Sequence, residues 1–153
     1  MDGQNKILEV RALKNGTVID HIPADRLFKV MNILDLENLD EMITFGTNLE
    51  SKRFGKKAII KLSGVYFKTN DINRIALVAP QAKLNVIKDY KVIEKKIVEV
   101  PDEIKGIVKC VNPACITNHE KVKTRFEVIN KEKIQLRCNY CEKITDWEHM
   151  DIQ

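Results

Sequence analysis

Four cysteines are the residues in this sequence whose type and spacing point most directly to a defined chemistry. They occur as Cys110 and Cys115 in KCVNPACI and as Cys138 and Cys141 in LRCNYCEK, and the chain has no other cysteine. Two closely spaced thiol pairs separated by 22 residues are typical of a four-thiolate zinc site. Because four protein sulfurs leave zinc no open coordination position, we expect one structural zinc ion per chain.

Two disulfides, or a redox C-x-x-C motif with two further thiols, are the alternative interpretations of the same cysteines. Neither explains why both pairs fall within one window of 32 residues. His119 follows Cys115 by four residues and could replace a ligand, but with four thiols available we expect it to be an exposed loop residue. Thiols kept reduced for metal binding also agree with a reducing compartment.

The N-terminus and the hydropathy of the chain predict a cytoplasmic protein that does not bind membranes. MDGQNKILEV lacks a basic region followed by an apolar one, as a secretion signal would have. No segment approaches the roughly 18 apolar residues of a membrane span.

Charge is distributed unevenly along the 153 residues. The whole formal surplus of +4 falls in residues 1–100, whereas residues 101–153 hold nine basic and nine acidic side chains. Zinc(II) with four thiolates would bring the cysteine segment to a charge of about −2. A zinc module that binds nucleic acid needs clustered cations, so we expect no nucleic-acid partner.

Motifs of common enzymes are missing from the sequence. It contains no G-x-S-x-G, H-E-x-x-H, Walker A or G-x-G-x-x-G pattern, and its cysteines do not fit the zinc deaminase signature. Asp20 and His21 are adjacent acid and base residues. Neighbouring residues of a strand point to opposite faces, so we predict that these two do not form a dyad.

The first hundred residues alternate between strand and helix periods. Residues 6–13 and 17–22 are predicted strands around an Asn15-Gly16 turn, followed by strands at 42–50, 57–64, 83–89 and 90–100. One helical stripe consists of Leu27, Val30, Met31 and Leu34, and a second of Ile72, Ile75, Ala76 and Ala79. The order contains a βαββαβ unit, which predicts an α+β fold of the ferredoxin-like sandwich kind, with two helices covering one face of a sheet.

A second, smaller domain is expected after Pro101. We predict a domain at residues 1–100 and a β-rich zinc-ribbon-like domain at residues 101–153, where short strands surround the cysteines. A segment this short needs a metal to supplement its core. Its predicted core consists of Ile107, Val108, Ile116, Val122, Phe126, Val128, Ile129, Ile134, Leu136, Ile144 and Trp147.

Several motifs resemble the regulatory chain of aspartate carbamoyltransferase. NGTVIDHIPA at residues 15–24 is similar to a signature of that family, and MITFGTNL, GKKAIIKL and IALVAPQAKLNVIKDYKV follow in the family's order. KCVNPACI and RCNYCEK resemble its zinc domain, so the resemblance covers essentially the whole chain. It implies a non-catalytic subunit whose N-terminal domain binds the nucleotide effectors CTP and ATP and whose zinc domain docks on catalytic chains, controlling pyrimidine biosynthesis.

The resemblance also implies particular site residues. Base contacts fall on Ala12, Leu13, Ile87 and Tyr90, ribose contacts on Val10, Asp20 and Lys61, and phosphate contacts on His21 and Lys95, with Lys57 and Asn85 beside them. Contacts to the catalytic chain fall on Asn112, Tyr140, Glu142 and Lys143. The sequence departs from the family at Arg11, where an acidic residue is frequent, and at Ala114, where an asparagine is frequent.

The family assembly implied by this resemblance has two catalytic trimers and three regulatory dimers, and the regulatory chains pair through their N-terminal domains.

The residues alone leave two other functions as alternatives. A zinc-ribbon nucleic-acid binder would need a basic face on the cysteine domain. A small redox or metal enzyme would need a reactive thiol or an open metal position.

Overall fold

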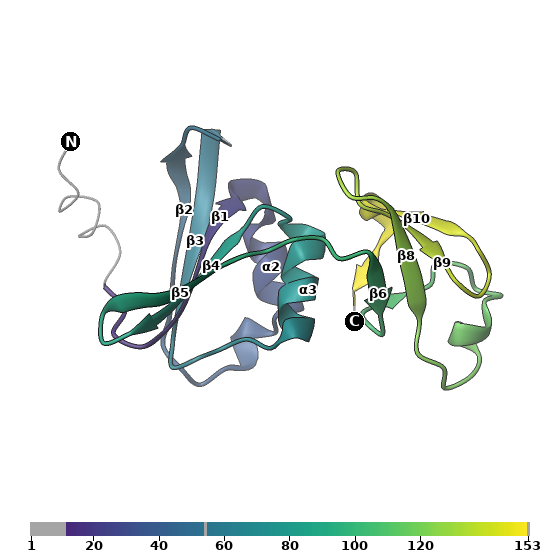
Figure 1. Ribbon diagram of the computed structural model, residues 1–153, viewed down its shortest axis with the longest axis horizontal. Helices are drawn as coiled ribbons and strands as arrows, with labels where there is room; N and C mark the ends of the chain where they lie inside the picture. Colours follow the sequence, from purple (N-terminus) through teal and green to yellow (C-terminus); the bar gives the residue numbers. More distant parts are fainter. Residues whose placement is uncertain (1–11, 54, 153) are drawn as a thin grey trace. The chain divides into compact units, whose positions relative to one another are not determined.

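The computed structural model describes residues 12–53 and 55–152 (Figure 1). The chain divides into two compact units, the first ending at Val98 and the second beginning at Glu99. Each unit has its own sheet and its own buried core. None of the described helices is long and apolar enough to cross a membrane.

A five-stranded antiparallel sheet forms the first unit. Its strands are β1 (Gly16–Pro23), β2 (Ile43–Ser51), β3 (Gly55–Ser63), β4 (Lys83–Lys88) and β5 (Lys91–Ile97), in the order β2-β3-β1-β4-β5. A helix connects β1 to β2, and another connects β3 to β4. The two strands of each such pair are not neighbours in the sheet, because β3 lies between β1 and β2, and β1 lies between β3 and β4. This is the ferredoxin-like arrangement that the sequence predicts, with β5 added at one edge.

Two helices, α2 (Leu27–Ile33) and α3 (Thr69–Val78), lie side by side against one face of this sheet (Figure 1). Short 3-10 turns at Ala24–Arg26 and Leu36–Asn38 flank α2. The helix stripes meet a row of apolar strand residues, and the fully buried core includes Ile19, Ile60, Leu84, Leu27, Val30 and Ile75. No helix of residues 12–53 or 55–98 covers the opposite face of the sheet, which we call the open face.

Gly16 is the first residue of β1, where it pairs with Ser63 of β3 on one side and Ile87 of β4 on the other. The predicted first strand falls mostly outside the described residues, and Ala12 to Asn15 are not in a strand. Gly16 has φ +142°, and a Cβ atom there would collide with the backbone carbonyl oxygen of Leu62 on β3. Glycine is therefore required by the close approach of two strands.

The second unit contains a small four-stranded sheet. Its strands are β6 (Glu103–Lys105), β8 (Arg125–Asn130), β9 (Gln135–Cys138) and β10 (Ile144–Asp146), in the order β10-β9-β8-β6. Strand β7 (Val108–Lys109) pairs with β11 (Asp151–Ile152), and 3-10 turns lie at Ile116–Asn118 and Trp147–His149.

Three residues predicted in the core of this unit are exposed. Ile144 is next to the buried Thr145 in β10, so its side chain points away from the core. Ile129 falls where the β8–β9 register shifts, and Ile116 begins a 3-10 turn beside the cysteines. The core itself consists chiefly of Phe126, Leu136, Ile104, Ile107, Val108 and Ile134.

Candidate functional site

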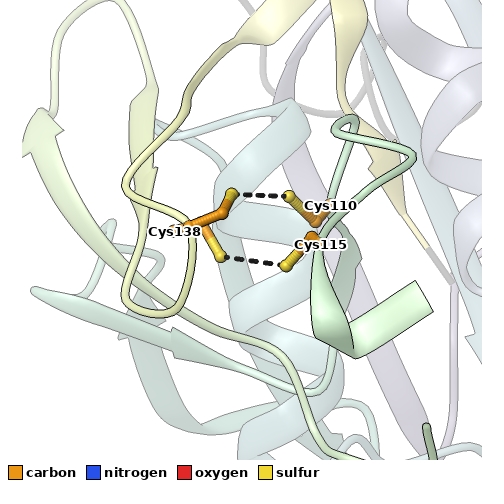
Figure 2. A group of neighbouring side chains, drawn as sticks. Cys110, Cys115 and Cys138 are labelled. Atoms are coloured by element: carbon orange, nitrogen blue, oxygen red, sulfur yellow. Dashed lines mark hydrogen bonds between the residues drawn. The ribbon is translucent and has the colours of Figure 1, made fainter. Parts of the chain in front are cut away.

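The four cysteines converge in the second unit from the ends of its strands. Cys110 directly follows β7, and Cys115 precedes the 3-10 turn at Ile116–Asn118. Cys138 is the last residue of β9, and Cys141 lies in the turn beyond it. Three of the four are buried, and Cys141 is partly exposed. Figure 2 shows Cys138 facing Cys115, with their sulfur atoms turned toward each other.

The sulfur atoms are spaced as a tetrahedral metal requires. All four Sγ atoms lie within 4.8 Å of one another. Cys110 and Cys141 are separated by 3.6 Å between sulfurs, and Cys115 and Cys138 by 3.8 Å. Sulfurs placed about 2.3 Å from a central zinc ion would be about 3.8 Å apart, whereas a disulfide bond is about 2.05 Å long. The arrangement fits a closed metal site and leaves the cysteines as free thiols.

Backbone hydrogen bonds hold both cysteine loops in shape. The Cys115 amide donates to the Asn112 carbonyl at 3.0 Å, and the Glu142 amide donates to the Cys138 carbonyl at 2.9 Å. The Asn118 side chain donates to the carbonyls of Cys110 and Asn112, at 3.0 and 2.8 Å. Because these bonds fix the loops, the sulfurs need little rearrangement to surround an ion.

The thiols differ in how readily they ionise. Burial raises the pKa of Cys110 to about 12 and also raises the pKa of Cys138. Burial opposes ionisation of Cys141 as well, but hydrogen bonds from the Asn112 side chain and the Lys143 backbone lower its pKa to about 7. A metal must therefore displace protons from the buried thiols, so its affinity should rise with pH.

The residues implied as partner contacts surround the cysteine cluster. Tyr140 and Glu142 flank Cys141, and their side chains are exposed, as is that of Lys143. Asn112 is partly buried, and its side chain accepts a hydrogen bond from the Ala114 amide at 3.0 Å. His119 is exposed, and its Nε2 atom lies 2.7 Å from the Pro113 carbonyl oxygen. It takes no place among the four metal ligands.

The open face of the first unit brings together the residues implied as ribose and phosphate contacts. Strand register places Lys61 of β3 opposite Val18 of β1, Val18 opposite Asn85 of β4, and Asn85 opposite Lys95 of β5. Residues directly opposite in an antiparallel sheet point to the same face. Lys61, Asn85 and Lys95 therefore form one row across the open face, although they lie on three strands.

A β-bulge corrects the prediction that Asp20 and His21 point to opposite faces. Ile19 pairs with Ile60 and Ile22 pairs with Ala58, so both Asp20 and His21 stand opposite the single residue Ile59. His21 adopts φ +61°, and its Nδ1 atom lies 3.6 Å from a carboxylate oxygen of Asp20. Strand alternation fails here because the bulge adds one residue to β1.

Several charged groups surround this bulge. The Lys57 ammonium lies 3.0 Å from the Asp20 carboxylate, and the Asp20 carboxylate also accepts the His21 amide at 2.6 Å. Burial lowers the pKa of His21 and outweighs the opposing effect of Asp20. Positive charge on Lys57, Lys83 and Arg53 lowers it further. Burial likewise lowers the pKa of Lys61, although Asp20 opposes this shift. At this end of the open face, the positively charged side chains outnumber the Asp20 carboxylate.

The opposite end of the open face is mainly apolar. Ile87 is nearly buried there opposite Gly16, and the exposed Tyr90 lies in the β4–β5 turn. The Tyr90 amide donates to the Lys14 carbonyl at 2.9 Å, which holds Leu13 and the preceding residue Ala12 beside this turn. Val10, the remaining implied contact, lies outside the described residues.

Comparison with known proteins gives the same family for both units. Residues 8–99 match the family model described as the aspartate carbamoyltransferase regulatory chain, allosteric domain, and residues 102–151 match its metal binding domain. The aspartate carbamoyltransferase regulatory chain of Bacteroides fragilis is 54% identical over 152 residues, which is 99% of each chain. That of Pyrococcus abyssi is 50% identical over 145 residues, 94% of this chain and 95% of the relative. This chain belongs to the aspartate carbamoyltransferase regulatory chain family.

Membership in the regulatory chain family confirms two predictions from the sequence. The family resemblance was correct, and the chain is a regulatory rather than a catalytic one. The second unit is a metal-binding domain whose four cysteines form the cluster described above. The sequence did not indicate Lys83 and Arg53, whose positive charges help to lower the pKa of His21. For Lys83, strand period supplied a signal, since it falls two residues before Asn85 on the same face.

Proposed function

We propose that this regulatory chain binds nucleotide effectors on the open face of its first unit and transmits their effect to catalytic chains through a zinc-stabilised second unit. CTP and ATP are the proposed effectors, and control of pyrimidine biosynthesis is the proposed outcome. The observation that carries the proposal is the gradient along the open face, which runs from apolar residues at one end to clustered cations at the other.

This gradient has the polarity of a nucleotide. A base fits the apolar end, where Ile87 and the strand backbone offer a surface and hydrogen-bonding groups. Along β1, Gly16 at the apolar end and Asp20 at the cationic end are four residues apart, or about 13 Å at 3.3 Å per residue. Asp20 and Lys61 can form hydrogen bonds with ribose hydroxyls, while Lys95 and His21 can donate to phosphates.

Zinc is the proposed metal, one ion per chain, held by Cys110, Cys115, Cys138 and Cys141. Four sulfur ligands at tetrahedral spacing favour it, and such an ion supplies folding energy without taking part in catalysis. The exposed residues beside the cluster, with Asn112, would then form the contact to a catalytic chain. Losing the metal would disorganise that contact surface.

Self-association of the first unit is proposed to occur along the β2 edge of the sheet. Phe28 of α2 and Phe45 of β2 are both exposed, and their rings meet edge to face with centroids 6.2 Å apart. They border a hollow of about 380 Å³ that also contains Met31, Leu36 and Ile43. An apolar patch beside an unpaired edge strand favours a dimer interface. The proposed complete assembly contains two catalytic trimers and three regulatory dimers.

Calorimetric titration of the isolated chain with CTP and ATP tests the nucleotide proposal. Saturable binding of either nucleotide, weakened by salt, is expected because phosphate contacts dominate at the cationic end.

Co-purification with a catalytic trimer, before and after treatment with a thiol-blocking mercurial, tests the docking proposal. A complex that survives complete removal of the metal would contradict the role given to the second unit.

A further inference from the structure

A row of exposed cations lies on the second unit, in the segment that leads into β8. Lys121, Lys123 and Arg125 are all exposed, whereas the two residues between them are partly or fully buried. The basic side chains therefore alternate outward along an extended segment. Lys109, the last residue of β7, is exposed as well. Although the side-chain charges of this unit balance overall, its cations are locally concentrated.

Three of these cations border one concave surface. Lys109, Lys121 and Lys123 line a hollow of about 310 Å³. The Gly106 amide donates to the Thr124 carbonyl at 2.9 Å, which joins the β6–β7 turn to the loop before β8. The aliphatic stem of Lys123 lies over Gly106, where an added Cβ atom would stand 3.8 Å from the lysine Cδ atom. The hollow thus brings together two segments that are distant in sequence.

The lysines of the hollow have no fixed negative partner. None of the three forms an ion pair with a residue that the structure describes. Glu120 is the one acidic residue among the described residues that line the hollow. Asp151 stands opposite Lys109 in the β7–β11 ladder and offsets part of its charge. Lys121 and Lys123 therefore carry most of the positive excess.

Backbone donors accompany the two lysines of the loop. The amides of Lys121 and Lys123 donate to no acceptor in the described part of the chain. The Asn118 side chain and the Thr124 hydroxyl, by contrast, already donate to backbone carbonyls. Ammonium and amide groups that lack an acceptor are the donors that phosphate oxygens need. The hollow therefore offers hydrogen bonds and positive charge to the same ligand.

We propose that this hollow binds a phosphate group, either as inorganic phosphate or as part of a small metabolite. Its volume lies at the lower end of the range for small-ligand sites, which begins at about 300 Å³. Lys109 directly precedes Cys110, and Lys121 lies in the loop after Cys115, so a ligand bridging these lysines would tie together both ends of the first cysteine loop. The site is separate from the nucleotide site proposed for the first unit.

Amide NMR of the full metal-bound chain, titrated with inorganic phosphate at constant ionic strength, tests this proposal. The amides of Lys121 and Lys123 should shift saturably. In Lys123→Gln, affinity should fall about tenfold or more, as expected for the loss of a charge-assisted hydrogen bond, whereas Lys123→Arg should retain most of it. Lys133→Gln is the matched control, because it removes the same charge from an exposed turn of the same unit and should change affinity less than twofold.

A second titration with glycerol phosphate distinguishes the two sources of the phosphate group. Tighter binding than that of inorganic phosphate would assign the site to a phosphorylated metabolite, and the reverse order would assign it to the free anion. Shifts of amides in the first unit report the nucleotide site and are read separately, so the failure of either site leaves the other standing.

Three results would overturn the phosphate site. The first is an equal response at Lys133 and in the hollow, which would show nonspecific attraction of anions. The second is an unchanged phosphate affinity in Lys123→Gln. The third is a polyglutamate peptide that binds the same amides more tightly than phosphate does, because the cations would then form a docking surface for an acidic protein.

Discussion

The four cysteines of the second unit come from two short loops, whereas the polar residues of the open face come from four strands of the first unit. In the loops, four or fewer residues separate the members of each thiol pair, and local hydrogen bonds shape each turn. On the open face, Asp20, Lys61, Asn85 and Lys95 meet only because the strands pair in register.

This difference predicts how each site should fail. Four thiolates share one ion, so the loss of one ligand should remove the metal and much of the folding energy of a small unit. The contacts of the open face are distributed over several strands, and the hydrophobic core lies on the other side of the sheet. The loss of one side chain should therefore weaken binding only by the contribution of that side chain and leave the fold intact.

Replacing Cys138 with serine should have the largest effect. The buried ligand is lost, zinc should not bind, and the unit that begins at Glu99 should unfold while the first unit stays folded. Metal analysis together with amide hydrogen exchange of each unit would measure this. His119→Ala is the control and should retain the metal. Stoichiometric zinc in Cys138→Ser would contradict the four-ligand site.

Gly16→Ala should damage the first unit and spare the metal. The added Cβ would meet the Leu62 carbonyl, and the backbone conformation is also unfavourable for alanine, so a destabilisation of about 2 to 4 kcal/mol is expected. Gly64→Ala separates the two causes, because Gly64 has φ +72° but open space around it. Thermal unfolding would compare them. Equal losses in both variants would exclude the close strand approach as the cause.

Lys95→Ala should weaken CTP and ATP binding by about 1.5 to 3 kcal/mol without altering the unfolding temperature, because one charge-assisted contact to phosphate is removed from an exposed position. Asp20→Ala should instead weaken cytidine and CTP alike, since its proposed partner is the ribose. Calorimetry at two salt concentrations measures both. If Lys95→Ala binds both triphosphates as tightly as the parent, the phosphate end has been assigned wrongly.

The smallest effect expected is a dependence of nucleotide binding on pH. Burial holds the pKa of His21 below its ordinary value, so the ring is neutral at pH 7 in the free chain, and a bound phosphate should raise that pKa. Binding should therefore take up protons and strengthen as pH falls from about 7.5 to 6. Titrations in buffers of different ionisation enthalpy would detect the uptake.

His21→Gln provides the control for this measurement, because the phosphates of the nucleotide also titrate in this range. The part of the proton uptake due to His21 should disappear in the variant. Uptake that is the same in both chains would show that His21 does not face the phosphates.

The order of strands and helices could be predicted from the sequence because each depends on local periodicity. The stripe of Leu27 and Val30 predicts α2, and that of Ile75 and Ala76 predicts α3 before Pro80 ends it. The metal cluster could be predicted for a similar reason, since C-x-x-C and C-x-x-x-x-C spacings place thiols within single turns.

Only the tertiary structure decided how the open face is arranged. The sequence alone did not reveal that β1 bulges at His21, because a bulge depends on how two strands pair and not on the strand that contains it. The sequence also could not show that Gly16 allows the close approach of the Leu62 carbonyl, or that Lys83 lies opposite Asp20. Both features depend on the register between strands that are distant in sequence. Local spacing determined the metal ligands, whereas long-range strand pairing determined which charges share one surface.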